Sequence, residues 1–207
     1  MSKIKYFIQQ SWLLIVSSFF FGLLIAVTSA GLSPRIRQNE INKRNRLTAI
    51  LLPEAKDFIP LAKPIEIQGR GGKKESVQVY KAVSESGQVV GWSFEAVGPG
   101  FQDKIKLVVA LDGDLEKIAG YDVLSSNETP GFGDRIKNNY YRDQFKGAPA
   151  EELKLVTVGN PNKIDSEIVA ISGATISSEA VVDIMNNYVT QIKEQLQKKG
   201  VTGDGKQ

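Results

Sequence analysis

The feature that most constrains this chain is an uncharged, largely apolar run from Trp12 to Ala30. A helix rises about 1.5 Å per residue, so a run of this length spans roughly 28 Å, close to the thickness of the hydrocarbon core of a bilayer. The rest of the chain mixes charged and polar residues with much shorter apolar stretches. We therefore expect one transmembrane helix over about residues 12–30, within an N-terminal segment 1–33.

The alternative for this run is a cleaved signal peptide, because Thr28, Ser29 and Ala30 supply small residues at a suitable place. Apolar regions of signal peptides are usually about 7–15 residues long, and the longer run here favours an anchor that is kept. The flanking charges point both ways on orientation. Lys3 and Lys5 precede the run and more basic residues follow it, so the positive-inside rule alone places the C-terminal part in the cytoplasm. A short basic N-terminus before an apolar run is, however, also typical of an exported chain.

Composition removes several classes of cofactor and partner. The 207-residue sequence has no cysteine and no histidine, so it offers no thiolate for an iron–sulfur cluster or zinc and no imidazole for haem or a histidine-dependent nucleophile. We therefore expect no metal site, and redox chemistry here requires an organic cofactor. The formal net charge is only +3, with basic and acidic residues interleaved, so we expect no nucleic-acid partner.

The region after the membrane segment begins with a polar helix. Residues 36–55 carry sparse apolar positions and reach Pro53, which predicts a helix that ends near that proline. We assign residues 34–75 to a helical stalk and linker. The polar end of the chain, 199–207, is expected to be a disordered tail.

The intervening region reads as strands followed by helices. Asp112-Gly113-Asp114 separates two apolar segments and predicts a hairpin. A short helix is expected over 135–145, and an amphipathic helix over about 177–198 should face the core. The expected strands are 77–83, 89–97, 105–111, 115–123, 153–158 and 168–171. This order predicts an α+β fold, with antiparallel hairpins and a long C-terminal helix, for a domain over 76–198.

The run Ser-Gly-Ala-Thr at 172–175 stands between an apolar strand and the long C-terminal helix. A helix N-terminus has unpaired N–H groups and a partial positive charge, and both favour a phosphate there. The glycine and alanine permit close backbone approach, and the hydroxyls of the motif's serine, Ser177 and Ser178 can donate hydrogen bonds to phosphate oxygens. The plain alternative is ordinary N-capping of the helix by Thr175 or Ser177.

A second constellation is the loop Glu128-Thr129-Pro130-Gly131-Phe132-Gly133. Two glycines and a proline fix an irregular backbone, and the phenylalanine supplies an apolar surface. Such a loop can lie against a planar ring, with backbone N–H groups free to bond ring carbonyls. The alternative is a surface turn between the hairpin and the following helix.

Three motifs, in this order and spacing, resemble the FMN-binding domain family. They are Gly98-Pro99-Gly100-Phe101 followed by Ile105, the 128–133 loop, and the run at 172–175. With one N-terminal span, the chain resembles the G subunits of the Rnf electron-transport complex and the related C subunits of the sodium-translocating NADH:quinone oxidoreductase. The resemblance covers roughly residues 89–189 and the anchor.

This resemblance implies that FMN is joined to Thr175 by a phosphoester bond, made by a flavin transferase that uses FAD. It implies an electron carrier, in a complex that passes electrons between ferredoxin and NAD and pumps ions, with other membrane and redox subunits as partners. The domain is expected on the outer, periplasmic face of the cytoplasmic (inner) membrane. We expect Ser172, Gly173, Ala174 and Ser177 around the phosphate, Glu128, Thr129, Pro130, Gly131, Phe132 and Gly133 around the ring, and Ile176 packed on the flavin face.

Two positions depart from the family pattern. Val169 stands three residues before Ser172, where an aspartate is usual, which bears on the efficiency of flavin attachment. Ser125 and Ser126 stand where a histidine is common, which bears on local packing or ring contacts. A flavin-free structural subunit and a membrane-anchored flavin sensor are the alternative functions.

Overall fold

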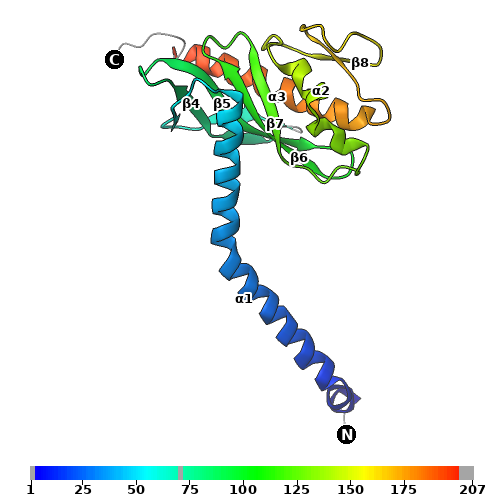
Figure 1. Cartoon of the computed structure of the whole chain (residues 1–207). Helices are drawn as coiled ribbons and strands as arrows, with labels where there is room; N and C mark the ends of the chain where they lie inside the picture. Colours follow the sequence, from blue (N-terminus) through cyan, green and yellow to red (C-terminus); the bar gives the residue numbers. More distant parts are fainter. Residues whose placement is uncertain (1–2, 70–71, 201–207) are drawn as a thin grey trace. The chain divides into compact units, whose positions relative to one another are not determined.

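The computed structural model describes residues 3–69 and 72–200 of the chain (Figure 1). The N-terminal apolar run lies in its first helix, α1 (Lys3–Leu51). The helix continues through Pro34, although proline lacks the N–H that a helical position donates. Instead of two separate helices, the apolar run and the polar stretch after it form one. Within the described ranges, α1 is the one helix long and apolar enough to cross a membrane.

Two compact units divide between Lys43 and Arg44, so the boundary falls inside α1. The helix ends at Leu51, two residues before Pro53, as expected for a proline that cannot continue a helix. The tail expected over 199–207 lies, from residue 201 on, outside the described residues.

A five-stranded antiparallel sheet, in the order β1-β4-β5-β6-β7, forms the centre of the second unit. The predicted hairpin is confirmed, because β6 and β7 pair in antiparallel fashion. The turn is longer than predicted and includes Leu115, which has a φ of 62°. Within the turn, the Asp112 carboxylate accepts the N–H groups of Glu116 and Lys117 at 2.8 and 3.1 Å. The strands are β1 (Asp57–Pro60), β4 (Val79–Val83), β5 (Val89–Pro99), β6 (Lys104–Asp112) and β7 (Ile118–Ser125).

Strands also occupy the segment before Ser76, which the sequence assigned to the linker. Strand β1 is the edge of the main sheet, and β2 (Ile65–Gln68) pairs with β3 (Lys74–Val77) in a separate two-stranded sheet. The strand predicted over 77–83 is interrupted at Gln78, whose side-chain amide donates to the carbonyl oxygen of Leu61 at 2.9 Å. Strands of four residues are too short for alternation to identify them in the sequence.

The long helix α3 (Thr175–Lys198) buries the apolar stripe predicted for it. Its buried positions from Ala180 to Leu196 share one core with Trp92 and Phe94 of β5 and with Leu107 of β6. The hydrophobic effect therefore holds α3 against the sheet, and the N-terminus of α3 is fixed by that packing.

The opposite face of the sheet has its own cover. Side chains alternate along a strand, so Val108 and Ala110 of β6 face away from the α3 core. Leu47, in the last turns of α1, packs with Val108, and Leu52 packs with Ala110. The sheet is thus covered on one face by α3 and on the other by residues 47–52, which belong to the same compact unit.

The segment 133–145 forms three short helical pieces, so the prediction of one helix over 135–145 was wrong. They are η2 (Gly133–Lys137), α2 (Asn139–Arg142) and η3 (Asp143–Phe145). Asn138 interrupts them with an extended ψ of 143°. Tertiary contacts act at both ends of this segment: the Tyr121 hydroxyl donates to the carbonyl oxygen of Ile136, next to the break, at 2.9 Å, and Phe145 lies edge-on to Tyr121 and Tyr141 with ring centroids 4.9 and 5.4 Å apart.

Two short strands carry the chain to the 172–175 motif. Strands β8 (Lys154–Val156) and β9 (Glu167–Val169) pair in parallel, and both are shorter than predicted. The antiparallel sheet with its hairpin, the separate helices and the long C-terminal helix confirm the predicted α+β class.

Candidate functional site

The 172–175 motif forms the turn from β9 into α3. Gly173 has a φ of 80°, a left-handed conformation that glycine adopts without a steric cost. Helix α3 begins at Thr175, two residues before the predicted start, and its N-cap is Ala174, which makes no side-chain capping hydrogen bond. N-capping by Thr175 or Ser177 therefore does not occur, because both residues lie inside the helix.

The N-terminus of α3 is open to an anion. Its first turn contains no acidic residue, and the N–H groups of a first turn have no partner within the helix. The Thr175 side chain is exposed, and its hydroxyl makes no hydrogen bond to any part of the chain that the structure describes. A free hydroxyl therefore stands at the positive end of a helix dipole.

Ser178 holds the turn from behind. Its hydroxyl donates to the Ala174 carbonyl oxygen at 2.9 Å and accepts the N–H of Ile171 at 3.0 Å. The buried Tyr141 hydroxyl donates to the Ser178 carbonyl oxygen at 3.0 Å. The expectation that Ser178 donates to a phosphate was wrong, since its one proton is already used.

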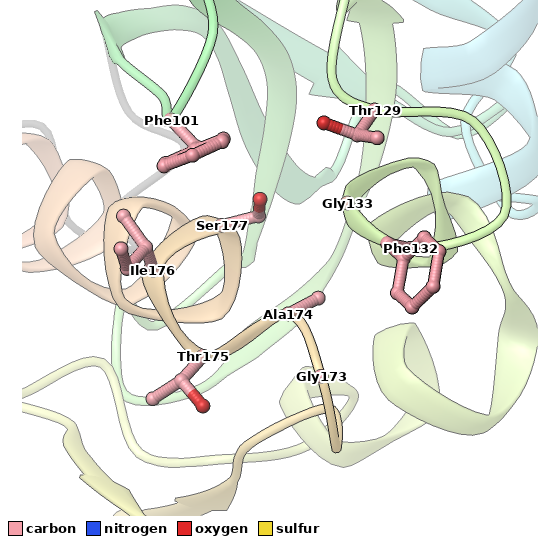
Figure 2. A pocket seen from close by; sticks show the side chains of 9 residues that line it. All are labelled: Phe101, Thr129, Phe132, Gly133, Gly173, Ala174, Thr175, Ile176 and Ser177. Carbon is pink, nitrogen blue, oxygen red and sulfur yellow. The ribbon is translucent and has the colours of Figure 1, made fainter.

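A cavity of about 520 Å³ opens in front of this turn (Figure 2). In the view of Figure 2, Phe101 and Ile176 lie on one side of it and Thr129 and Phe132 on the other. The cavity brings together most of the predicted site residues and adds Phe101, which the sequence indicated only as part of a family motif. The lining residues are Phe101, Thr129, Phe132, Gly133, Gly173, Ala174, Thr175, Ile176 and Ser177.

Ser172, Pro130 and Gly131 are exposed but do not line the cavity. Phe101 was missed because its motif, residues 98–101, indicated only the family. The signal available was the sequence Pro-Gly-Phe, which ends at Phe101 in this motif and at Phe132 in the 128–133 loop.

The wall of the cavity is mainly apolar and carries no charged side chain. Phe101, Phe132 and Ile176 are each more than half exposed, at 60%, 53% and 54%. Large apolar side chains left open around a hollow mark a binding site for an apolar or aromatic ligand. None of the lining residues is titratable near neutral pH, so the cavity can hold and orient a group but supplies no acid or base.

Glu128 lies behind this wall and not at its surface. Its side chain is buried, Ser177 donates its hydroxyl to Oε2, and the N–H of Gln102 donates to Oε1 at 3.0 Å. Burial raises the pKa of this carboxyl, but hydrogen bonds from Ser177 and from the N–H groups of residues 101–103 lower the pKa more, so the net shift is downward. Ser177 therefore lines the cavity, but its hydroxyl proton goes to Glu128 and not to a phosphate.

The residues present fit FMN. The volume falls within the roughly 300–1,000 Å³ of small-molecule and cofactor sites, and the three apolar side chains suit an aromatic ring system. The open helix N-terminus and the unbonded Thr175 hydroxyl suit a phosphate. Among the described residues, no group of acidic side chains could hold a metal ion.

The chain is similar to known proteins over most of its length. Residues 100–190 match the model of the FMN-binding domain. The G subunit of the ion-translocating oxidoreductase complex of Methanosarcina acetivorans is 31% identical, over 88% of this chain and 92% of that protein. The G subunit of the Na(+)-translocating ferredoxin:NAD(+) oxidoreductase complex of Acetobacterium woodii is 30% identical, over 84% of this chain and 85% of that protein.

Solved structures share the fold. NqrC of Shewanella oneidensis superimposes with a TM-score of 0.53 at 22% identity, over 70% of this chain and 73% of that one. The C subunit of the Na(+)-translocating NADH-quinone reductase of Parabacteroides distasonis gives a TM-score of 0.53 at 19% identity, over 77% and 95%.

Proposed function

The chain belongs to the family of G subunits of ion-translocating oxidoreductase complexes. We propose that it carries electrons within such a complex, on an FMN that is held by a phosphoester bond to Thr175. The chain is a membrane electron-transfer subunit with an FMN-binding domain and, among the residues that the structure describes, one helix able to span a membrane. The covalent bond, the partners and the orientation are the finer parts of the proposal.

The observation that carries the attachment is the Thr175 hydroxyl, exposed and unbonded at the open N-terminus of α3. In the proposed maturation, a flavin transferase joins Thr175 Oγ to the phosphorus of the FMN half of FAD. The anhydride bond of FAD breaks, AMP leaves, and the hydroxyl proton goes with AMP or to solvent. The bound phosphodiester keeps a negative charge beside the helix N-terminus, which stabilises it.

The chemistry of the cavity favours a carrier over a site of substrate turnover. The flavin supplies the electron chemistry, and the protein supplies binding and orientation. Without a titratable lining residue, the cavity cannot assist proton transfer to a substrate by a side chain. We therefore propose that electrons enter and leave through other membrane and redox subunits of the complex, between ferredoxin and NAD, as the names of the relatives suggest.

The alternative assignment is a C subunit of a sodium-translocating NADH-quinone reductase. One relative of that kind, from Yersinia pestis, is 26% identical over 63% of this chain and 52% of that protein. The similarity to G subunits is higher and extends over more of both chains, which favours the G assignment. For orientation, we propose that the FMN-binding domain lies on the outer, periplasmic face of the cytoplasmic membrane.

The test of attachment is fluorescence in a denaturing gel. The full chain, produced with its flavin transferase, should keep a fluorescent flavin after denaturation, and Thr175→Ala should lose all of it. Thr157→Ala is the matched control, since it removes an exposed threonine hydroxyl outside the 172–175 motif, and it should stay fluorescent. Fluorescence that persists in Thr175→Ala would mean that the flavin is attached elsewhere. A wild-type chain without fluorescence would favour a flavin-free structural subunit.

A further inference from the structure

We infer that Glu128 is a positioning residue whose fixed negative charge, held behind the cavity wall, makes the bound flavin harder to reduce. This inference rests on the proposed FMN site, and it assigns Glu128 a role different from the ring contact that the sequence suggested. It depends on three observations: how the carboxylate is held, what it joins, and what charge lies near it.

The carboxylate is held by hydrogen bonds alone. Glu128 is 4% exposed, and in the described part of the chain no lysine or arginine forms an ion pair with it. One oxygen accepts the Ser177 hydroxyl, and the other accepts the N–H of Gln102, with the neighbouring N–H groups of residues 101 and 103 also directed to the carboxylate. Successive backbone N–H groups of this kind form an anion-binding concavity, which keeps the group ionised.

The same contacts join the three segments that form the cavity. Glu128 begins the 128–133 loop, Gln102 follows Phe101, and Ser177 lies in the first turn of α3. The backbone approaches closely on both sides, because a Cβ added at Gly100 would lie 2.4 Å from Oε1 and one added at Gly133 would lie 3.0 Å from Oε2. Phe101, Gly133 and Ser177 all line the cavity, so the carboxylate is one residue layer behind its surface.

The charge of Glu128 acts on the flavin through this layer. When a bound flavin gains one electron from a partner redox subunit, it gains one negative charge unless a proton follows. A like charge in a poorly hydrated setting opposes that gain, and burial keeps salt from screening it. Two positive charges compete with it: the Arg135 guanidinium lies 5.8 Å from the Phe132 ring centroid, and the Lys137 ammonium donates to the Ser126 carbonyl oxygen at 3.5 Å. Both side chains are exposed, so solvent screens their charge.

The test compares midpoint potentials of full chains loaded with flavin by the transferase, titrated in detergent with dithionite as the reductant. Glu128→Gln keeps the shape: its amide oxygen can accept the N–H of Gln102, and its amide nitrogen can donate to Ser177. We expect flavin content near that of the wild type and a more positive potential. A shift on the order of tenfold in the one-electron equilibrium constant corresponds to about 59 mV. Glu85→Gln, an exposed carboxylate in the turn between β4 and β5, is the charge control and should leave the potential unchanged.

Equal potentials in the loaded wild-type and Glu128→Gln chains would overturn the inference and leave the proposed FMN site intact. A wild-type chain that takes no flavin would instead overturn the proposed function. If Glu128→Gln does not fold, Ser177→Ala decides. It removes one compensating hydrogen bond and keeps the charge, so we expect a more negative potential, and an unchanged or raised potential contradicts the inference.

Discussion

Two glycines of the 128–133 loop occupy different surroundings, and each tests a different property of the site. Gly131 has a φ of 76° and open space where a Cβ would be, so its replacement costs only backbone strain. A Cβ at Gly133 would lie 2.7 Å from Ser177 Oγ and 3.0 Å from the Cβ of Glu128. Ser177 would have to move away, and its hydrogen bond to Glu128 would be lost.

We therefore predict that Gly133→Ala lowers the free energy of unfolding by about 1–3 kcal/mol and reduces the yield of attached flavin. Gly131→Ala is the matched control, with a loss of about 1–2 kcal/mol from the left-handed conformation and a normal flavin yield. Thermal unfolding and gel fluorescence measure the two quantities. Equal flavin yields in both variants would show that the contact between Ser177 and Glu128 does not shape the cavity.

The sequence indicated which residues lie at the site better than it indicated where their side chains point. Thr129, Phe132 and Thr175 were expected at the site and line the cavity. Glu128 was expected there too, but its carboxylate points inward to backbone N–H groups that come from a segment 26 residues away in the chain. Which way a side chain points depends on such distant partners, and spacing along the sequence does not contain that information.

At the scale of elements, the residues at the end of α1 and just after it pack against the main sheet. Leu52 is buried against Ala82 and Ala110 on the outer face of the sheet. Gly91 makes the contact possible, because a Cβ there would lie 2.7 Å from Leu52 Cδ2. Residues 44–52 are therefore part of the folded unit, and the sheet depends on them for its second cover.

Leu52→Ala should accordingly lower the free energy of unfolding of the full chain in detergent by about 2–4 kcal/mol. This loss corresponds to a melting temperature lower by roughly 5–15 °C. Ile50→Ala removes an apolar side chain that is 61% exposed and should change the melting temperature little. The two variants differ in burial and are two residues apart. A similar effect of both would mean that the outer face of the sheet does not need this cover.

Elements with a strong period were predictable, and those fixed by tertiary contacts were not. The α3 stripe and the β6–β7 hairpin have long, regular patterns, and both were confirmed. Strands β1, β2 and β3 are four residues each and exist because they pair with partners, and β8 and β9 pair over only three residues. The segment 133–145 is broken at Asn138, where the Tyr121 hydroxyl, from a distant strand, binds the neighbouring carbonyl oxygen of Ile136, and such tertiary contacts override helix propensity.

At the scale of the whole molecule, two sequence signals disagree about the side of the membrane. Two lysines precede the apolar run of α1, and five basic residues follow it by residue 46, which by charge alone keeps the domain in the cytoplasm. The resemblance to the FMN-binding domain family instead implies an exported domain, which is the orientation that we propose. The charge rule is a bias on insertion and not an absolute bar, so the two signals call for a direct measurement.

The sequence has no cysteine, which makes a single introduced thiol a clean reporter of orientation. Val158, 88% exposed in the loop between β8 and β9, is a suitable place for it. We predict that Val158→Cys reacts with a membrane-impermeant maleimide in intact cells, because the reagent reaches only the outer side. Ser2→Cys, before the span, should react only after lysis. The reverse pattern would place the domain in the cytoplasm, and electrons would then have to reach the flavin from that side without crossing the membrane.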